Sequence, residues 1–120
     1  MKVIIAGSRS ITNYQHVYQA WLNSKFDLTE IVSGGARGVD SLGEELAKEL
    51  DIPVKRFIPH WREYGKKAGI LRNVEMAEYA DALIAVWDGR SKGTAHMIAH
   101  FAKTKKPFYI EKVHKEKNAS

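Results

Sequence analysis

Short apolar runs alternate along this chain with longer segments whose apolar residues recur at helical spacing. In the segment 39–50, for example, Val39, Leu42 and Leu46 fall on one side of a helix. The short runs predict strands over Lys2–Ala6, Glu30–Ser33, Val54–Ile58, Ala82–Trp87 and Phe108–Glu111. The longer segments predict helices over Tyr14–Ser24, Val39–Leu50, Lys66–Tyr79 and Thr94–Lys103.

This alternation indicates an α/β fold in which helices cover both faces of a parallel sheet. Right-handed crossovers favour a doubly wound, five-stranded sheet, with 3-2-1-4-5 as the common strand order. The run Ala82–Trp87 is apolar on both faces, as a strand in the middle of such a sheet must be. We expect Asn13 or Thr12 to cap the first helix. A single domain is expected over residues 1–111, followed by a basic, frayed C-terminal tail over 112–120.

Six of the nine glycines sit in three turns, each directly after an apolar run. The turns are Gly7-Ser8-Arg9, Ser33-Gly34-Gly35-Ala36-Arg37-Gly38-Val39-Asp40 and Asp88-Gly89-Arg90-Ser91-Lys92-Gly93-Thr94. In the expected strand order these turns meet at the switch point, where doubly wound sheets bind their ligands. Glycine lets backbone N–H groups approach a ligand, and a helix start adds free donors and partial positive charge. The three turns therefore predict a site for an anion, in particular a phosphate.

The second of these turns carries the sharpest signal. Its backbone N–H groups and the start of the next helix can surround a phosphate, and Arg37 can add a bidentate contact. The spacing is neither GxGxxG nor a Walker A loop, because no Gly-Lys-Ser or Gly-Lys-Thr closes it. The alternative is a tight strand-to-helix turn in which Asp40 interacts favourably with the helix dipole.

The other two turns offer further contacts. Ser8 can donate a hydrogen bond and Arg9 can pair with an anion, unless this turn is a plain loop with an exposed arginine. Thr94 either directs its hydroxyl and N–H at the site or simply caps its helix. The predicted contacts in the third turn are Asp88, Gly89, Ser91, Gly93 and Thr94, whereas Arg90 and Lys92 are interpreted as solvated.

Histidine and aromatic residues outside the turns give weaker signals. His96 and His100 are four residues apart, which is a metal-ligand spacing. No H-E-x-x-H motif is present and no third ligand is evident, so we interpret them as one face of a helix and predict no metal site. Trp61 or Tyr64 can stack on a base or seal an edge of the core.

Composition sets the broad class of protein. The hydrophobic fraction of 44% and charged fraction of 28% are ordinary for a soluble globular domain, and no apolar run approaches a membrane span. There is no cysteine, and the apolar start is too short for a signal peptide, so a cytoplasmic setting is expected. Of the formal charge of +5, residues 103–120 carry +4, from six lysines and two glutamates. The domain itself is close to neutral, which argues against a nucleic-acid-binding surface.

A family resemblance enters with these motifs taken together. They are Gly7-Ser8-Arg9, the turn 33–40, Arg72-Asn73, Ala80-Asp81 and Gly93-Thr94, each at its expected strand end or helix. In this order they resemble the SLOG superfamily of Rossmann-like domains, which are akin to the cytokinin-activating LOG proteins and the DNA-processing protein A family. The stretch 61–76 is similar to small stand-alone bacterial and phage members related to YspA and YpsA. The resemblance implies a pocket for a nucleotide or nucleotide-derived ligand, with Arg72 and Asn73 at the site.

The resemblance also bears on catalysis. LOG proteins are hydrolases that split the base from ribose phosphate, and the glutamate of their PGGxGTxxE loop acts in that reaction. The matching position here is Met97, whose thioether cannot accept a proton as a carboxylate can. Asp88 or Asp40 could supply a carboxylate, although each has a simpler structural role.

Three functions therefore remain open from the sequence. The first is a binding module, a sensor or sequestering protein for a nucleotide-derived molecule. The second is a nucleotide-processing hydrolase, and the third is a protein that binds single-stranded DNA. No obligatory cofactor is expected, although a phosphate ligand can bring its own magnesium ion. A homo-oligomer paired through helices is a further expectation, with Trp21, Met97 and Phe101 on the shared surface.

Overall fold

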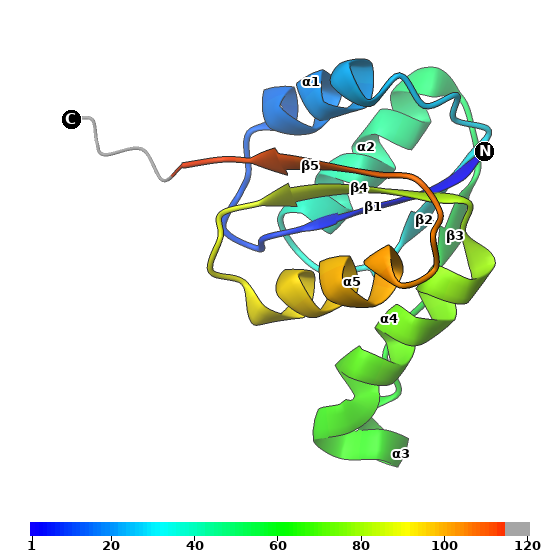
Figure 1. Cartoon of the computed structure of the whole chain (residues 1–120), viewed down its shortest axis with the longest axis vertical. Coiled ribbons are helices and arrows are strands. Elements are labelled where there is room, and N and C mark those ends of the chain that lie inside the picture. The colour runs from blue at the N-terminus through cyan, green and yellow to red at the C-terminus, as the bar shows by residue number, and fades with distance from the viewer. Residues whose placement is uncertain (115–120) are drawn as a thin grey trace.

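The computed structural model describes residues 1–114 and contains a five-stranded parallel sheet in the order β3-β2-β1-β4-β5. This architecture and strand order confirm the fold predicted from the sequence (Figure 1). The strands are β1 (Lys2–Gly7), β2 (Glu30–Ser33), β3 (Val54–Arg56), β4 (Ala82–Trp87) and β5 (Phe108–Lys112). The helices are α1 (Tyr14–Ser24), α2 (Val39–Leu50), α3 (Trp61–Tyr64), the 3₁₀ turn η1 (Gly65–Lys67), α4 (Ala68–Tyr79) and α5 (Lys92–Ala102).

Helices cover both faces of the sheet, with α1 and α2 on one side and α4 and α5 on the other (Figure 1). Alternate residues of the central strand β1 serve the two sides, as the period of a strand requires. Val3 and Ile5 join the core under α1 and α2, whereas Ile4 joins the core under α4 and α5. Two buried layers therefore hold β1 in place, and β1 pairs in parallel with both β2 and β4.

The first helix begins as predicted, and the last begins earlier. Asn13 caps α1, because its side-chain oxygen accepts a hydrogen bond from the N–H of Gln15 at 3.0 Å. The last helix was expected to start at Thr94, but α5 starts at Lys92. The reason is that Ser91 is the cap, and its Oγ accepts the Thr94 N–H at 3.3 Å.

The region between β3 and α4 departs most from the prediction. The strand expected over Val54–Ile58 ends at Arg56, where its partner β2 also ends, at Ser33. The helix expected over Lys66–Tyr79 begins at Ala68 and follows two short helical turns. Gly65 separates those turns with a φ of +57°, a value that glycine adopts without strain. As a result, α3 and the first turns of α4 project away from the sheet (Figure 1).

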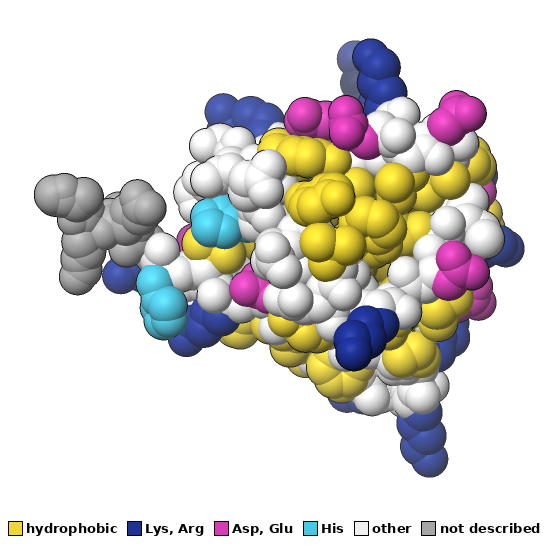
Figure 2. All heavy atoms as spheres, turned by 90° about the horizontal axis from the view of Figure 1, so that it is seen from above, with side chains coloured by type: hydrophobic (Ala, Val, Ile, Leu, Met, Phe, Trp, Pro, Cys, Tyr) yellow, Lys and Arg dark blue, Asp and Glu magenta, His cyan; other side chains and the backbone are white. Residues whose placement is uncertain are grey.

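The surface and the C-terminal region complete the fold. Apolar side chains gather on the face seen from above in Figure 2, on the α1 side of the sheet. On α1, Tyr18 is partly exposed and packs edge-on against Trp21 at 5.6 Å between ring centroids. The prediction that Met97 and Phe101 lie on a surface shared between two copies of the chain is wrong, because both are fully buried under the sheet.

No helix within residues 1–114 is long and apolar enough to cross a membrane. The predicted tail lies largely outside the described residues, because β5 includes Lys112 and the description ends at residue 114.

Candidate functional site

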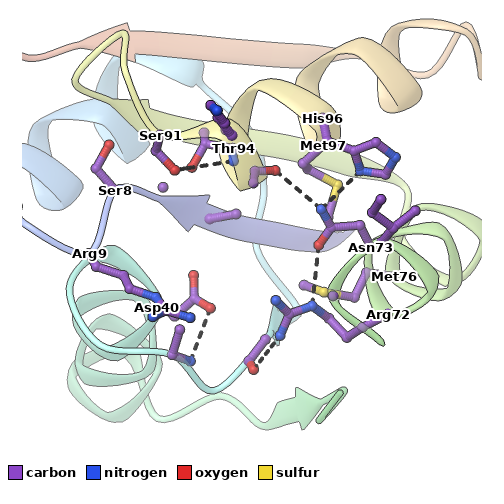
Figure 3. A pocket seen from close by; sticks show the side chains of 18 of the residues that line it. Ser8, Arg9, Asp40, Arg72, Asn73, Met76, Ser91, Thr94, His96 and Met97 are labelled. Carbon is purple, nitrogen blue, oxygen red and sulfur yellow. Dashed lines mark hydrogen bonds between the residues drawn. The ribbon is translucent and has the colours of Figure 1, made fainter. Parts of the chain in front are cut away.

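A pocket of about 660 Å³ opens at the carboxyl ends of β1 and β4, where the three glycine turns meet (Figure 3). It is lined by most of the residues expected from the sequence: Gly7, Ser8, Arg9, Gly34, Ala36, Asp40, Arg72, Asn73, Asp88, Ser91, Gly93 and Thr94. Five expected residues lie outside its lining: Ser33, Gly35, Arg37, Gly38 and Gly89. It is also lined by Ala6, Ser10, Trp61, Lys66, Gly69, Ile70, Met76, Arg90, Lys92, His96 and Met97.

The turn after β1 joins the two other turns. Ser8 donates its N–H to the carbonyl of Val86 at 3.1 Å, and its Oγ accepts the Asp88 N–H at 2.9 Å. At Gly7 a Cβ would lie 1.9 Å from the Val86 oxygen, so no larger residue fits there. The hydroxyl of Ser8 therefore sits at a fixed place between the ends of β1 and β4.

The turn after β2 uses its own backbone donors. The Gly35 N–H donates to Ser33 Oγ at 3.1 Å, and the Ala36 N–H donates to Asp40 Oδ2 at 3.1 Å. The N–H of Val39, at the start of α2, donates to the Ser8 carbonyl at 3.3 Å. Three donors of the turn that looked most like a phosphate cradle are thus taken by acceptors from the protein itself.

Two residues of the same turn have roles away from the pocket. The Ser33 hydroxyl donates to Glu44 at 2.7 Å, and Glu44 in turn pairs with Arg56 on β3. The side chain of Arg37 is exposed and does not line the pocket. Neither side chain lines the pocket in this structure.

Arg72, from α4, reaches across to the turn after β2. Its Nη1 donates to the Gly34 carbonyl at 2.7 Å, and its Nε donates to Asn73 Oδ1 at 3.2 Å. A Cβ on Gly34 would lie 2.5 Å from Arg72 Nη1 and 2.8 Å from Asp40 Oδ2. Glycine at position 34 therefore lets the guanidinium and the carboxylate approach the same spot. Burial lowers the pKa of Arg72, an effect that the charge of Asp40 opposes.

Asn73 links α4 to the start of α5. Its Nδ2 donates to the Gly93 carbonyl at 3.2 Å and lies 3.2 Å from Nδ1 of His96. When the amide donates to that nitrogen, neutral His96 carries its proton on Nε2. Burial, followed by the charges of His100 and Lys103, lowers the pKa of His96, which favours this neutral form. Sequence reasoning missed His96 as a lining residue, although its place one turn after Ser91 was the available signal.

The two histidines of α5, His96 and His100, lie against each other. The rings of His96 and His100 stack with 6.0 Å between their centroids. Within residues 1–114 there is no group of three His, Cys, Asp or Glu side chains that could hold a metal ion. Their interpretation as one face of a helix fits this arrangement.

The turn after β4 is organised by Asp88. Its Oδ1 accepts the N–H groups of Arg90 at 2.8 Å and Ser91 at 3.0 Å. These backbone hydrogen bonds, with the Arg90 bond the largest contribution, lower the pKa of Asp88. Among residues 1–114, no acceptor takes the N–H groups of Lys92 or Gly93, the first two residues of α5. Within residues 1–114, α2 also begins with two free N–H groups, those of Asp40 and Ser41, but its first turn contains an acidic residue and that of α5 does not.

The charge of the pocket is positive. Its lining holds five basic residues, Arg9, Lys66, Arg72, Arg90 and Lys92, against the two carboxylates Asp40 and Asp88. The apolar lining is contributed by Ala6, Trp61, Ile70, Met76 and Met97. The pocket therefore combines anion-attracting groups with an apolar surface that suits a flat ring.

Comparison with known proteins places the chain in a family. A curated relative, "Gene 61 protein" of Mycobacterium phage D29, is 35% identical over 105 residues, which cover 79% of this chain and 83% of that protein. No solved structure matches the chain. Residues 1–64, which include β1, β2 and the first two glycine turns, match the YspA, cpYpsA-related SLOG family. The chain belongs to the YspA, cpYpsA-related SLOG family.

Proposed function

We propose that this protein binds a nucleotide or nucleotide-derived ligand in the pocket, with a phosphate at the start of α5. The observation that carries the proposal is the pair of free N–H groups at Lys92 and Gly93, which open beside the pocket. The hydroxyls of Ser91 and Thr94, 3.0 Å apart, lie at the same place (Figure 3). Membership of the SLOG family supports a nucleotide-related ligand.

The start of α5 suits a phosphate better than the start of α2. At α2 the Val39 N–H already donates to Ser8, and the carboxylate of Asp40 occupies the first turn. A phosphate there would meet a negative charge and displace hydrogen bonds within the protein. At α5 the first turn contains no acidic residue, and Lys92 adds a positive charge.

The size and lining of the pocket suit the rest of a nucleotide. A volume of about 660 Å³ lies within the usual range for pockets that enclose small ligands. Trp61 is 53% exposed and lines the pocket with Ile70 and Met76, so a base can stack there at little cost. Sugar and base would thus extend from the start of α5 toward α4.

Binding is favoured over turnover by the residues that face the ligand. The position of the LOG glutamate is Met97, which lines the pocket and has no titratable group. The carboxylate of Asp88 is held by the N–H groups of Arg90 and Ser91. Sensing or sequestration of the ligand is the function that follows.

The test is a thermal-shift and calorimetry screen of the whole protein with AMP, ADP, ADP-ribose, NAD and a cyclic dinucleotide. A ligand at a hundred times its Kd stabilises the fold by about 2.7 kcal/mol, which raises Tm by several degrees. The informative variant is Gly93→Asp, because a Cβ there meets no atom within 4 Å and an acidic residue suits a first turn. We expect Gly93→Asp to keep or raise the Tm of the free protein and to lose the ligand-induced shift.

The matched control is Gly93→Ala, which adds the Cβ without the charge. We expect Gly93→Ala to retain at least part of the shift, so that the difference between the two variants measures anion repulsion. Equal shifts in wild type and Gly93→Asp would contradict a phosphate at α5. Release of base or phosphate during incubation would indicate the hydrolase instead, and binding of a single-stranded oligonucleotide that weakens steeply with salt would indicate the DNA binder.

A further inference from the structure

The carboxylate of Asp40 is buried, yet it faces the pocket. Its residue is 6% exposed and lies in the first turn of α2. Figure 3 shows it directed into the pocket from the side opposite Ser91 and Thr94. Oδ2 accepts the N–H of Ala36, and no other hydrogen bond reaches this carboxylate from residues 1–114. An acceptor so placed keeps lone pairs for a donor that arrives with the ligand.

The nearby arginines do not take up that free capacity. Within the part of the chain that the structure describes, the only ion pair joins Arg56 and Glu44. Arg72 directs its donors to the Gly34 carbonyl and to Asn73. Arg72 and Arg9 therefore act on Asp40 through their charge and not through hydrogen bonds. Buried carboxylates are ordinarily hydrogen-bonded, so a donor from the ligand would complete the site.

The missing donor must be neutral or positive, because a phosphate would be repelled. With a phosphate at the start of α5, the next part of a nucleotide toward the opposite wall is its sugar. A ribose carries two adjacent hydroxyls, and a carboxylate can accept a hydrogen bond from each of them. We propose that Asp40 accepts the 2′ and 3′ hydroxyls of a ribose and makes the pocket selective for ribonucleotides over deoxynucleotides. This inference rests on the proposed function.

The test uses sugar phosphates, so that it does not depend on the base. Ribose 5-phosphate and 2-deoxyribose 5-phosphate are titrated into the protein, and the amide NMR signals of Lys92 and Gly93 report occupation of the phosphate site. A hydrogen bond to a charged group gives the wild type about tenfold or greater preference for ribose 5-phosphate. In Asp40→Asn the amide oxygen still accepts the Ala36 N–H, but the charge is lost, and we expect the preference to fall toward one.

The control is Glu44→Gln. Glu44 lies one turn after Asp40 on α2 and does not line the pocket, so the variant removes a carboxylate without changing the site. It should keep the preference of the wild type, and melting curves establish that both variants are folded. Equal affinity of the wild type for the two sugar phosphates would overturn the inference and leave the phosphate site standing. Absence of any shift at Lys92 and Gly93 would overturn the proposed function itself. Affinity that depends on added Mg²⁺ and loses that dependence in Asp40→Asn would reassign the carboxylate to a cation and overturn ribose recognition.

Discussion

The two glycine turns that lead into α2 and α5 resemble each other in sequence and differ in what they offer a ligand. In the turn before α2, three backbone donors are taken by Ser33, Asp40 and the Ser8 carbonyl. In the turn before α5, Asp88 accepts the donors of the loop itself, and the first N–H groups of the helix remain free. A glycine-rich turn can bind an anion only through the donors that no acceptor of the protein takes up.

The carboxylates of the two turns differ in the same way. Burial raises the pKa of Asp40, and the Ala36 N–H and the charge of Arg72 oppose that change without cancelling it. Backbone hydrogen bonds from Arg90 and Ser91 lower the pKa of the more exposed Asp88. The ionised carboxylate of Asp40 therefore lowers the stability of the fold, whereas that of Asp88 stabilises its loop.

The largest expected contrast concerns stability. Gly38 has a φ of +73°, and a Cβ there would lie 2.4 Å from the Ser8 carbonyl oxygen and 2.5 Å from backbone atoms of Arg9. We expect Gly38→Ala to lower the free energy of unfolding by about 3 kcal/mol, from strain and from displacement of the neighbouring turn. Gly93→Ala should instead raise it by up to about 1 kcal/mol, because the position is helical and open. Urea denaturation of both variants measures the difference.

If Gly38→Ala lowers the free energy of unfolding no more than an alanine substitution at an exposed helical position does, the turn before α2 is not tightly closed. The urea m-value serves as the control. An unchanged m-value assigns the effect to the native state, since a change would indicate altered compactness.

The next contrast compares two exposed arginines that each follow a strand end. Arg9 lines the pocket, whereas Arg37 does not. For whichever nucleotide binds in the screen, we expect Arg9→Ala to weaken affinity about tenfold, since a charge-assisted contact is lost. The loss in Arg37→Ala should be smaller, and calorimetry at fixed ionic strength compares the two. A larger loss in Arg37→Ala would return the phosphate to the turn before α2.

The smallest contrast concerns the two carboxylates and pH. At neutral pH, Asp88→Asn should lower the free energy of unfolding by about 1 kcal/mol, because a charged acceptor of two N–H groups is replaced. Since the folded pKa of Asp88 is lowered from 3.8, this stabilisation is present above pH 4 and is lost as pH falls through the folded value. The folded pKa of Asp40 is raised from 3.8, so its ionised form costs stability as pH rises through the folded value.

Asp40→Asn should therefore gain stability relative to the wild type as pH rises from 3 to 7, while Asp88→Asn loses it. Urea denaturation of the three proteins across this range measures both trends. If the stabilities of the two variants relative to the wild type changed with pH in the same direction, the assignment of Asp40 as the buried and Asp88 as the hydrogen-bonded carboxylate would be contradicted.

Much of the fold could be predicted because its signals are local. The segments Tyr14–Ser24, Glu30–Ser33, Val39–Leu50 and Ala82–Trp87 have the same bounds in the structure as in the prediction. Each combines a clear apolar period with a clear end signal. The start of α4 was missed because a helical pattern runs through Lys66 and Lys67, which form the 3₁₀ turn η1 in place of a first α-helical turn.

The site could be predicted only in part, because its chemistry depends on contacts between distant segments. The three turns and the pair Arg72 and Asn73 line one pocket, with the exception of Gly89 and of five residues in the turn before α2. The N–H of Val39 in this turn is taken by Ser8, about thirty residues away along the chain, and no local pattern records that contact. Arg90 and Lys92, interpreted as solvated, are exposed in the structure and also line the pocket.

Hydrogen bonds hold helix α4 at its middle, through Arg72 and Asn73, and at its C-terminal end. At its C-terminal end, Lys106 Nζ donates to the carbonyls of Ala77 at 2.9 Å and Ala80 at 2.7 Å, while the other end carries α3 away from the sheet (Figure 1). The wall that contains Trp61 and Ile70 therefore belongs to a segment that projects from the sheet, whereas Ser8 and Ser91 lie in the turns that follow β1 and β4. For a ligand in this pocket, we expect stricter selection at the end beside Ser8 and Ser91 than at the end beside Trp61 and Ile70.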